Sequence, residues 1–146
     1  MRAATMPNAE NQPMSSTESL ISNKRLWTGR IVSGLPTLFL LMDGSMKLYK
    51  PRVVVEATVQ MGYPESVIVG IGVALLLSTL LFLLPRTSIL GAILLTGYLG
   101  GAVASQVRVS AVPFNLVFPV LIAALLWCGL WLRDRRLQTL LPLRTQ

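Results

Sequence analysis

The stretch that decides the fold class is SILGAILLTGYLGGAVASQV, residues 88–107. It contains no charged residue, and it is as long as the roughly 20 apolar residues that an α-helix needs to cross a bilayer core about 30 Å thick. The next charge along the chain is Arg108. We therefore predict a membrane-spanning helix over residues 88–107.

Three further apolar stretches of similar length lie on either side of this one. They are residues 26–48, 64–84 and 112–132. Pro64 suits the first position of a helix, and Pro85 ends the same stretch. With residues 88–107, these stretches predict an all-α membrane protein, an antiparallel bundle of four transmembrane helices within residues 24–146.

The amino-terminal part of the chain, residues 1–23, has a different composition. It is polar and contains two prolines and a cluster of serine and threonine. Because it lacks the apolar core of a signal peptide, we expect a disordered polar tail.

The segment between the first two spans, residues 50–63, is too short and too polar to cross a membrane. Pro51 could open a short helix with one face formed by Val54, Val55, Thr58 and Met61. Its valine run would suit a strand equally well. We expect an interfacial helix or loop over the mouth of the bundle.

The composition excludes most kinds of catalytic site. Hydrophobic residues make up 53% of the chain and charged residues 13%, against roughly 45–50% and about 25% in soluble domains. The chain has no histidine, and its one cysteine is Cys128. These counts exclude Ser/His/Asp and Cys/His catalytic sets, histidine-ligated metal or haem, and an intrachain disulfide. We predict no catalytic residue, no metal site and no covalently bound cofactor.

The net charge of +7 comes from cations that flank the apolar stretches. Cations in these positions are typical of a protein that contacts lipid head groups, so we expect no nucleic-acid partner. In an even-numbered bundle, about eight lysines and arginines would lie on the side of the termini and four on the other side. The richer side is expected to be cytoplasmic, which predicts a multi-pass protein of the cell membrane, here a bacterial inner membrane, with both termini inside.

Two ionisable residues interrupt the first span near its end. Asp43 and Lys47 are four residues apart, with the acid on the amino-terminal side, so that on a helix they can pair in the favourable orientation. A pair that faces the bundle would be a functional site, because an ionisable residue costs about 2.5–3.5 kcal/mol within a span. The alternative is a pair at the outer interface that ends the helix.

Several other polar residues are expected at the same outer end of the bundle. With Asp43 and Lys47 they could build one ligand-binding cluster, or they could form a solvated rim of unrelated side chains. They are Glu56, Tyr63, Gln106, Arg108 and Asn115.

The third span also carries small residues at a spacing of four in two registers. One register is Gly97, Gly101 and Ser105, and the other is Thr96, Gly100 and Ala104. Small side chains at this spacing allow helices to pack closely in membranes. We predict helix packing, and the alternative is that the glycines make room for a flat ligand.

Four stretches of the chain carry a resemblance to a known family. They are RIVSGLPTLFLLMDGSMKLYKP (residues 30–51), VVEATVQMGYPES (54–66), FLLPRTSILGAILLTGYLGGAVASQVRV (82–109) and VFPVLIAALLWCGLWLRDRRLQTLLPLR (117–144). Over residues 30–144 the chain resembles the DoxX-like family of small four-helix membrane proteins. Relatives in this family are associated with quinone-linked sulfur oxidation, as small subunits of a thiosulfate:quinone oxidoreductase, and with membrane-bound oxidoreductase assemblies.

The chain departs from the family pattern at two positions. Many relatives carry histidine after the GGAVA stretch and before the FP of the fourth helix, where this chain has Gln106 and Asn115. A neutral amide can form hydrogen bonds, but it neither transfers protons near pH 7 nor serves as a good ligand for transition metals. The resemblance therefore does not carry a haem, metal or proton-transfer role over to this chain.

Two classes of function remain. In the first, the protein is a non-catalytic subunit or accessory factor of a quinone-linked membrane oxidoreductase, with a quinone as ligand and a redox subunit or a second copy of the chain as partner. In the second, it is a permease-like bundle for a small solute or lipid, with ionisable residues along its path. We favour the first, because one four-helix unit encloses little pore volume.

Overall fold

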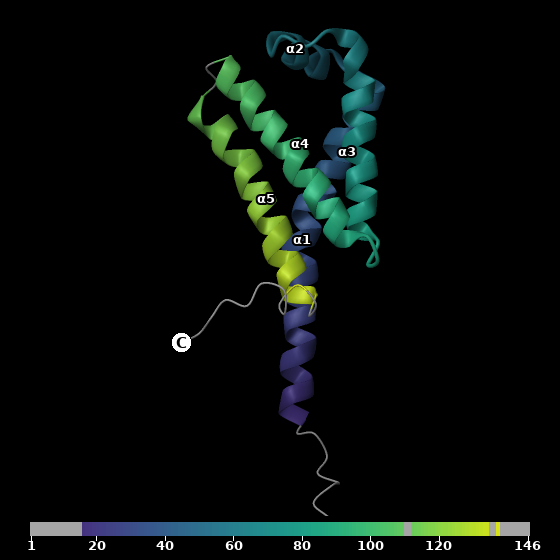
Figure 1. Cartoon of the computed structure of the whole chain (residues 1–146), viewed down its shortest axis with the longest axis vertical. Helices are drawn as coiled ribbons and strands as arrows, with labels where there is room; N and C mark the ends of the chain where they lie inside the picture. Colours follow the sequence, from purple (N-terminus) through teal and green to yellow (C-terminus); the bar gives the residue numbers. More distant parts are fainter. Residues whose placement is uncertain (1–15, 110–111, 135–136, 138–146) are drawn as a thin grey trace, which may run out of the picture.

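A computed structural model describes residues 16–109, 112–134 and 137 (Figure 1). Its elements are α1 (Ser16–Tyr49), α2 (Arg52–Gln60), the 3-10 turn η1 (Glu65–Val67), α3 (Ile68–Leu83), α4 (Ser88–Arg108) and α5 (Pro113–Arg133). Four stretches are long and apolar enough to span a membrane, namely Leu26–Tyr49, Glu65–Leu83, Ser88–Arg108 and Pro113–Arg133. The predicted all-α four-helix membrane bundle is confirmed.

The first helix begins earlier than the sequence analysis predicted. α1 starts at Ser16, so residues 16–23, which we expected to belong to the polar tail, are helical. A serine followed three residues later by glutamate, as in residues 15–18, is a helix-start signal that the prediction did not use. The rest of the expected tail, residues 1–15, lies outside the described residues.

The four long helices form a ring in the order α1, α3, α4, α5. Each packs against its two neighbours in this ring, and α1 lies diagonally across from α4. The turn between α3 and α4 lies at the same end of the bundle as the end of α5, whereas α2 lies at the opposite end (Figure 1). From the turn, α4 and α5 diverge from α1 and α3 towards the α2 end.

The helices approach one another most closely at glycines. A Cβ atom on Gly129 of α5 would stand 2.6 Å from Ser33 Cβ of α1, and one on Gly72 of α3 would stand 2.7 Å from Lys47 Cβ. A Cβ on Gly91 of α4 would overlap the backbone of Phe82. Small residues at these crossings therefore let the backbones meet, as is usual for helices packed in lipid.

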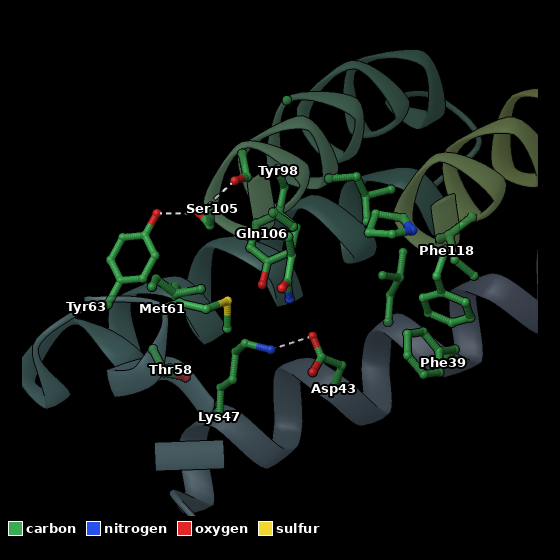
Figure 2. A pocket seen from close by; sticks show the side chains of 18 residues that line it. Phe39, Asp43, Lys47, Thr58, Met61, Tyr63, Tyr98, Ser105, Gln106 and Phe118 are labelled. Carbon is green, nitrogen blue, oxygen red and sulfur yellow. Dashed lines mark hydrogen bonds and ion pairs between the residues drawn. The ribbon is translucent and has the colours of Figure 1, made fainter. Parts of the chain in front are cut away.

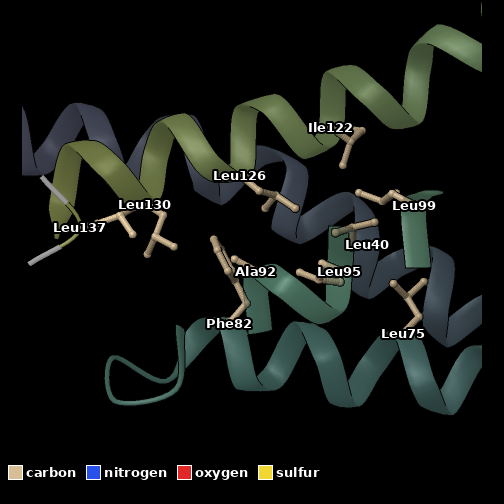
Figure 3. Close-up of a cluster of buried hydrophobic side chains, with 10 residues drawn as sticks. All are labelled: Leu40, Leu75, Phe82, Ala92, Leu95, Leu99, Ile122, Leu126, Leu130 and Leu137. Atoms are coloured by element: carbon tan, nitrogen blue, oxygen red, sulfur yellow. The ribbon is translucent and has the colours of Figure 1, made fainter. Parts of the chain in front are cut away.

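Apolar side chains fill the bundle from the end opposite α2 to about its middle (Figure 3). Phe82, Leu95, Leu126 and Leu130 are almost completely buried. Serine and threonine side chains within the spans donate to the carbonyl of the residue four positions earlier, as Thr79 does to Leu75 at 2.8 Å. Among the described residues, each buried side-chain nitrogen or oxygen has a hydrogen-bond partner.

The segment after α1 forms a short helix and not a strand. Pro51 is the N-cap of α2, and the face that points inward consists of Val54, Val55, Thr58 and Met61, which are buried or partly buried. This is the predicted face. Gly62 has a φ of +83°, which only glycine adopts readily, and it turns the chain from α2 towards η1.

Candidate functional site

A cavity of about 430 Å³ lies between the diagonal helices α1 and α4, at the end of the bundle that α2 covers (Figure 2). Its lining comes from all four spans and from the α2 segment. The lining residues are Phe39, Leu40, Asp43, Lys47, Thr58, Met61, Tyr63, Ile71, Gly97, Tyr98, Leu99, Gly101, Ala102, Ser105, Gln106, Phe118, Pro119 and Ile122.

The polar side chains of the lining meet near the middle of the cavity. Lys47 Nζ donates to Asp43 Oδ2 at 2.5 Å, and the two side chains are 16% and 32% exposed. The hydroxyl of Tyr98 and the amide of Gln106 point from α4 towards this pair (Figure 2). One ammonium, one carboxylate, one hydroxyl and one amide therefore face the same space, which gives a ligand both hydrogen-bond donors and acceptors.

Aromatic and aliphatic side chains form the rest of the lining. Phe39 of α1 and Phe118 of α5 meet edge to face, with ring centroids 5.2 Å apart. Leu40, Leu99 and Ile122 belong both to the buried core and to the cavity lining. They close the cavity on the side of the core, so that it ends within the bundle.

The α2 segment covers the cavity through hydrogen bonds to α4. The hydroxyls of Tyr63 and Ser105 are 2.6 Å apart, and Arg108 Nη2 donates to the backbone carbonyl of Met61 at 2.6 Å. The Arg108 guanidinium also lies over the Tyr63 ring, 5.7 Å from its centroid. These contacts tie the residues that follow α2 to the end of α4.

The structure brings together part of the predicted polar cluster. Asp43, Lys47, Tyr63 and Gln106 line the cavity, and Arg108 holds the α2 segment from outside the lining. Lys47 lies in the last turn of α1, which ends at Tyr49, and both Asp43 and Lys47 line the cavity.

Two predicted residues lie away from the cavity. Glu56 is exposed on the face of α2 opposite Thr58. Asn115 is exposed in the first turn of α5, where this helix has diverged from α1 (Figure 1). Neither belongs to the lining of this cavity.

The prediction missed several lining residues, among them Phe39, Tyr98 and Phe118. Their sequence signal was weak, because an aromatic residue in a span is ordinary. Of these residues, only Tyr98 could have been predicted to belong to the site. It places a hydroxyl in the middle of the third span, eight residues before Gln106 on the same helix. A buried tyrosine hydroxyl usually needs a polar partner.

Three of the small residues of α4 have no close neighbour among the described residues. No described heavy atom lies within 4 Å of the position that a Cβ would take on Gly97, Gly100 or Gly101. These three glycines therefore do not pack closely against another helix of the described chain, because their face of α4 points away from the neighbouring helices. A packing role for these three glycines therefore stays a prediction.

The other small residues of α4 have separate roles. Thr96 accepts a hydrogen bond from Trp127 Nε1 of α5 at 2.9 Å, which is a contact between helices. Ser105 bonds Tyr63, and Ala104 is exposed. Gly97, Gly101 and Ser105 line the cavity, which agrees with the alternative that small residues leave space for a ligand.

Four helices of spanning length around a largely apolar cavity define an integral membrane protein. The sequence model of the DoxX-like family matches residues 31–129, and the chain belongs to this family. The matched region contains the whole cavity lining. No curated protein and no solved structure matches the chain.

Proposed function

We propose that the protein is a non-catalytic accessory subunit of a membrane oxidoreductase system and that it holds a quinone in the cavity between α1 and α4. The observation that carries the proposal is the composition of the lining, in which a few convergent polar groups stand within an apolar and aromatic surface. Sites for small organic molecules commonly have this composition and a volume of about 300–1,000 Å³.

The polar groups suit both redox forms of such a ligand. A quinone carbonyl accepts hydrogen bonds, and the Lys47 ammonium, the Tyr98 hydroxyl and the Gln106 amide can donate them. A quinol hydroxyl donates, and the Asp43 carboxylate can accept. The Phe39 and Phe118 rings offer an aromatic surface on which a flat ring can rest.

The protein would act as an accessory because its own side chains carry no redox group. It has no histidine and a single cysteine, and Cys128 is exposed on α5 and outside the cavity lining. Electrons for the quinone would come from a partner subunit. A permease-like function is less well supported, because the buried side chains of Phe82, Leu126 and Leu130 fill the bundle beyond the cavity.

The proposal is tested by the ligand that travels with the protein. We expect solvent extraction and mass spectrometry to recover a quinone from protein purified in mild detergent. Gln106→Leu should lower the recovered amount about two- to tenfold, because it removes one hydrogen bond worth about 0.5–1.5 kcal/mol. Asn115→Leu is the matched control, since it also replaces a side-chain amide by leucine but does so outside the cavity lining, and the recovered amount of quinone should not change. A wild-type protein without quinone would contradict the proposal.

We also propose that both termini lie in the cytoplasm, as the distribution of cations supports. In a Cys128→Ala background, Ser16→Cys at the start of α1 should react with a membrane-impermeant thiol reagent only after lysis. Gln60→Cys, on the exposed side of α2, should react in intact cells. Labelling in the opposite order would show that the orientation is inverted.

A further inference from the structure

Two glycines of α4 lie both in the cavity lining and on the outer surface of the bundle. Gly97 and Gly101 line the cavity, both are exposed, and no described heavy atom lies within 4 Å of the position of a Cβ on either. A residue that lines a cavity and is also accessible from outside marks a place where the cavity reaches the surface. Because both glycines lie within a membrane span, that surface faces lipid.

Described residues border the opening at these glycines. Ile71 of α3 lines the cavity on the other side of the gap. The bond between Tyr63 and Ser105 closes the gap towards the α2 end. Towards the turn between α3 and α4 the two helices meet, and from there they diverge (Figure 1). We call the gap between Ile71, Gly97 and Gly101 the lateral opening.

Described side chains occupy three other sides of the cavity. The edge-to-face pair of Phe39 and Phe118 lies between α1 and α5. Leu40, Leu99 and Ile122 close the side of the core. The α2 segment, held by Arg108, covers the end that faces water. At the lateral opening the α4 border consists of two glycines, so no side chain of α4 has to move there to let a ligand pass.

We infer that the ligand is a membrane lipid with an apolar tail, whose polar ring lies among Asp43, Lys47 and Gln106 and whose tail leaves through the lateral opening into the bilayer. The inference rests on the proposed function for the ring and adds the tail and its path. A hydrocarbon tail fits such a passage, because it moves from lipid to an apolar surface without contact with water. Glycine at residues 97 and 101 leaves the width that the tail needs.

The inference is tested by blocking the opening and comparing two probes in lipid nanodiscs. The probes are decylubiquinone and its benzoquinone head group without the tail, and binding is followed by quenching of tryptophan fluorescence. Gly101→Leu should weaken binding of decylubiquinone about tenfold or more, because the leucine side chain competes with the tail for space. Binding of the tailless probe should stay within about twofold of wild type.

Two further variants separate this effect from general damage. Gly100→Leu places the same side chain on the same helix, at an exposed glycine that does not line the cavity, and it should bind both probes as wild type does. Ile71→Trp narrows the opening from α3 and should repeat the effect of Gly101→Leu.

The possible outcomes are distinct. If Gly101→Leu and Ile71→Trp bind decylubiquinone like wild type, the lateral opening is not the path of the tail, although the proposed function stands. If Gly101→Leu loses both probes equally, the glycine borders the ring and the assignment of the tail is wrong. A wild-type protein that binds neither probe would overturn the proposed function together with this inference.

Discussion

Gly91→Ala is expected to destabilise the protein by about 1–3 kcal/mol or more, although it adds a single methyl group. A Cβ at residue 91 would overlap the backbone nitrogen and Cα of Phe82. A flexible side chain could rotate away, but backbone cannot, so α3 and α4 would have to separate next to the turn that joins them. The separation would also disturb Phe82, which is completely buried in the core.

Gly100→Ala is the matched control for this prediction, because it makes the same change on the same helix. Nothing described lies within 4 Å of the new methyl group, and alanine favours a helix over glycine by up to about 1 kcal/mol. Thermal unfolding in detergent, followed by size-exclusion chromatography of the surviving protein, should show a lower midpoint for Gly91→Ala only. Equal midpoints for the two variants would mean that α3 and α4 are not in close contact at this point.

The positions of the spans could be predicted from the sequence because charges and prolines mark where each helix leaves the membrane. The predicted span 88–107 corresponds to the observed helix Ser88–Arg108, and the predicted span 112–132 corresponds to Pro113–Arg133. The inward face of α2 was also predictable, since residues three and four apart share one side of a helix. The ends of the spans and the inward face of α2 both depend on residues that are close together in the sequence.

The composition of the site could be predicted only in part, because it depends on how the helices are arranged. Periodicity shows that Gly97 and Gly101 share a face of α4, but not whether that face meets another helix or lipid. Similarly, Asn115 lies at the expected end of the bundle, yet α5 has diverged there and carries it away from Asp43. Hydropathy does not determine the order of helices in a ring or the angles between them.

The second large effect is expected at the ion pair within α1. Removing one member of a buried pair leaves a charge without its partner and costs about 3–5 kcal/mol. Because Asp43 remains 32% exposed to the cavity, we expect a value near the lower end of that range. Asp43→Asn and Lys47→Met keep the size of the side chains but not the pairing of charges. Each should therefore accumulate poorly in membranes and unfold at a lower temperature.

The double variant Asp43→Asn, Lys47→Met is expected to recover much of this loss, since it leaves no unpaired charge in the bundle. Lys50→Met supplies the matched control. Lys50 and Glu65 form a longer pair of 3.6 Å outside the cavity lining, with side chains 34% and 60% exposed, and exposed pairs of this kind contribute about 0–1 kcal/mol.

In the double variant of Asp43 and Lys47, stability should recover whereas ligand binding should not. Its cavity keeps Tyr98 and Gln106 but lacks the ammonium and the carboxylate, so it should accumulate nearly like wild type and yet carry less quinone. Membrane abundance, unfolding midpoint and extracted quinone can be measured on the same preparations. If both single variants accumulate and unfold like wild type, the two charges are each satisfied by solvent, and the pair neither stabilises the bundle nor presents a paired charge to a ligand.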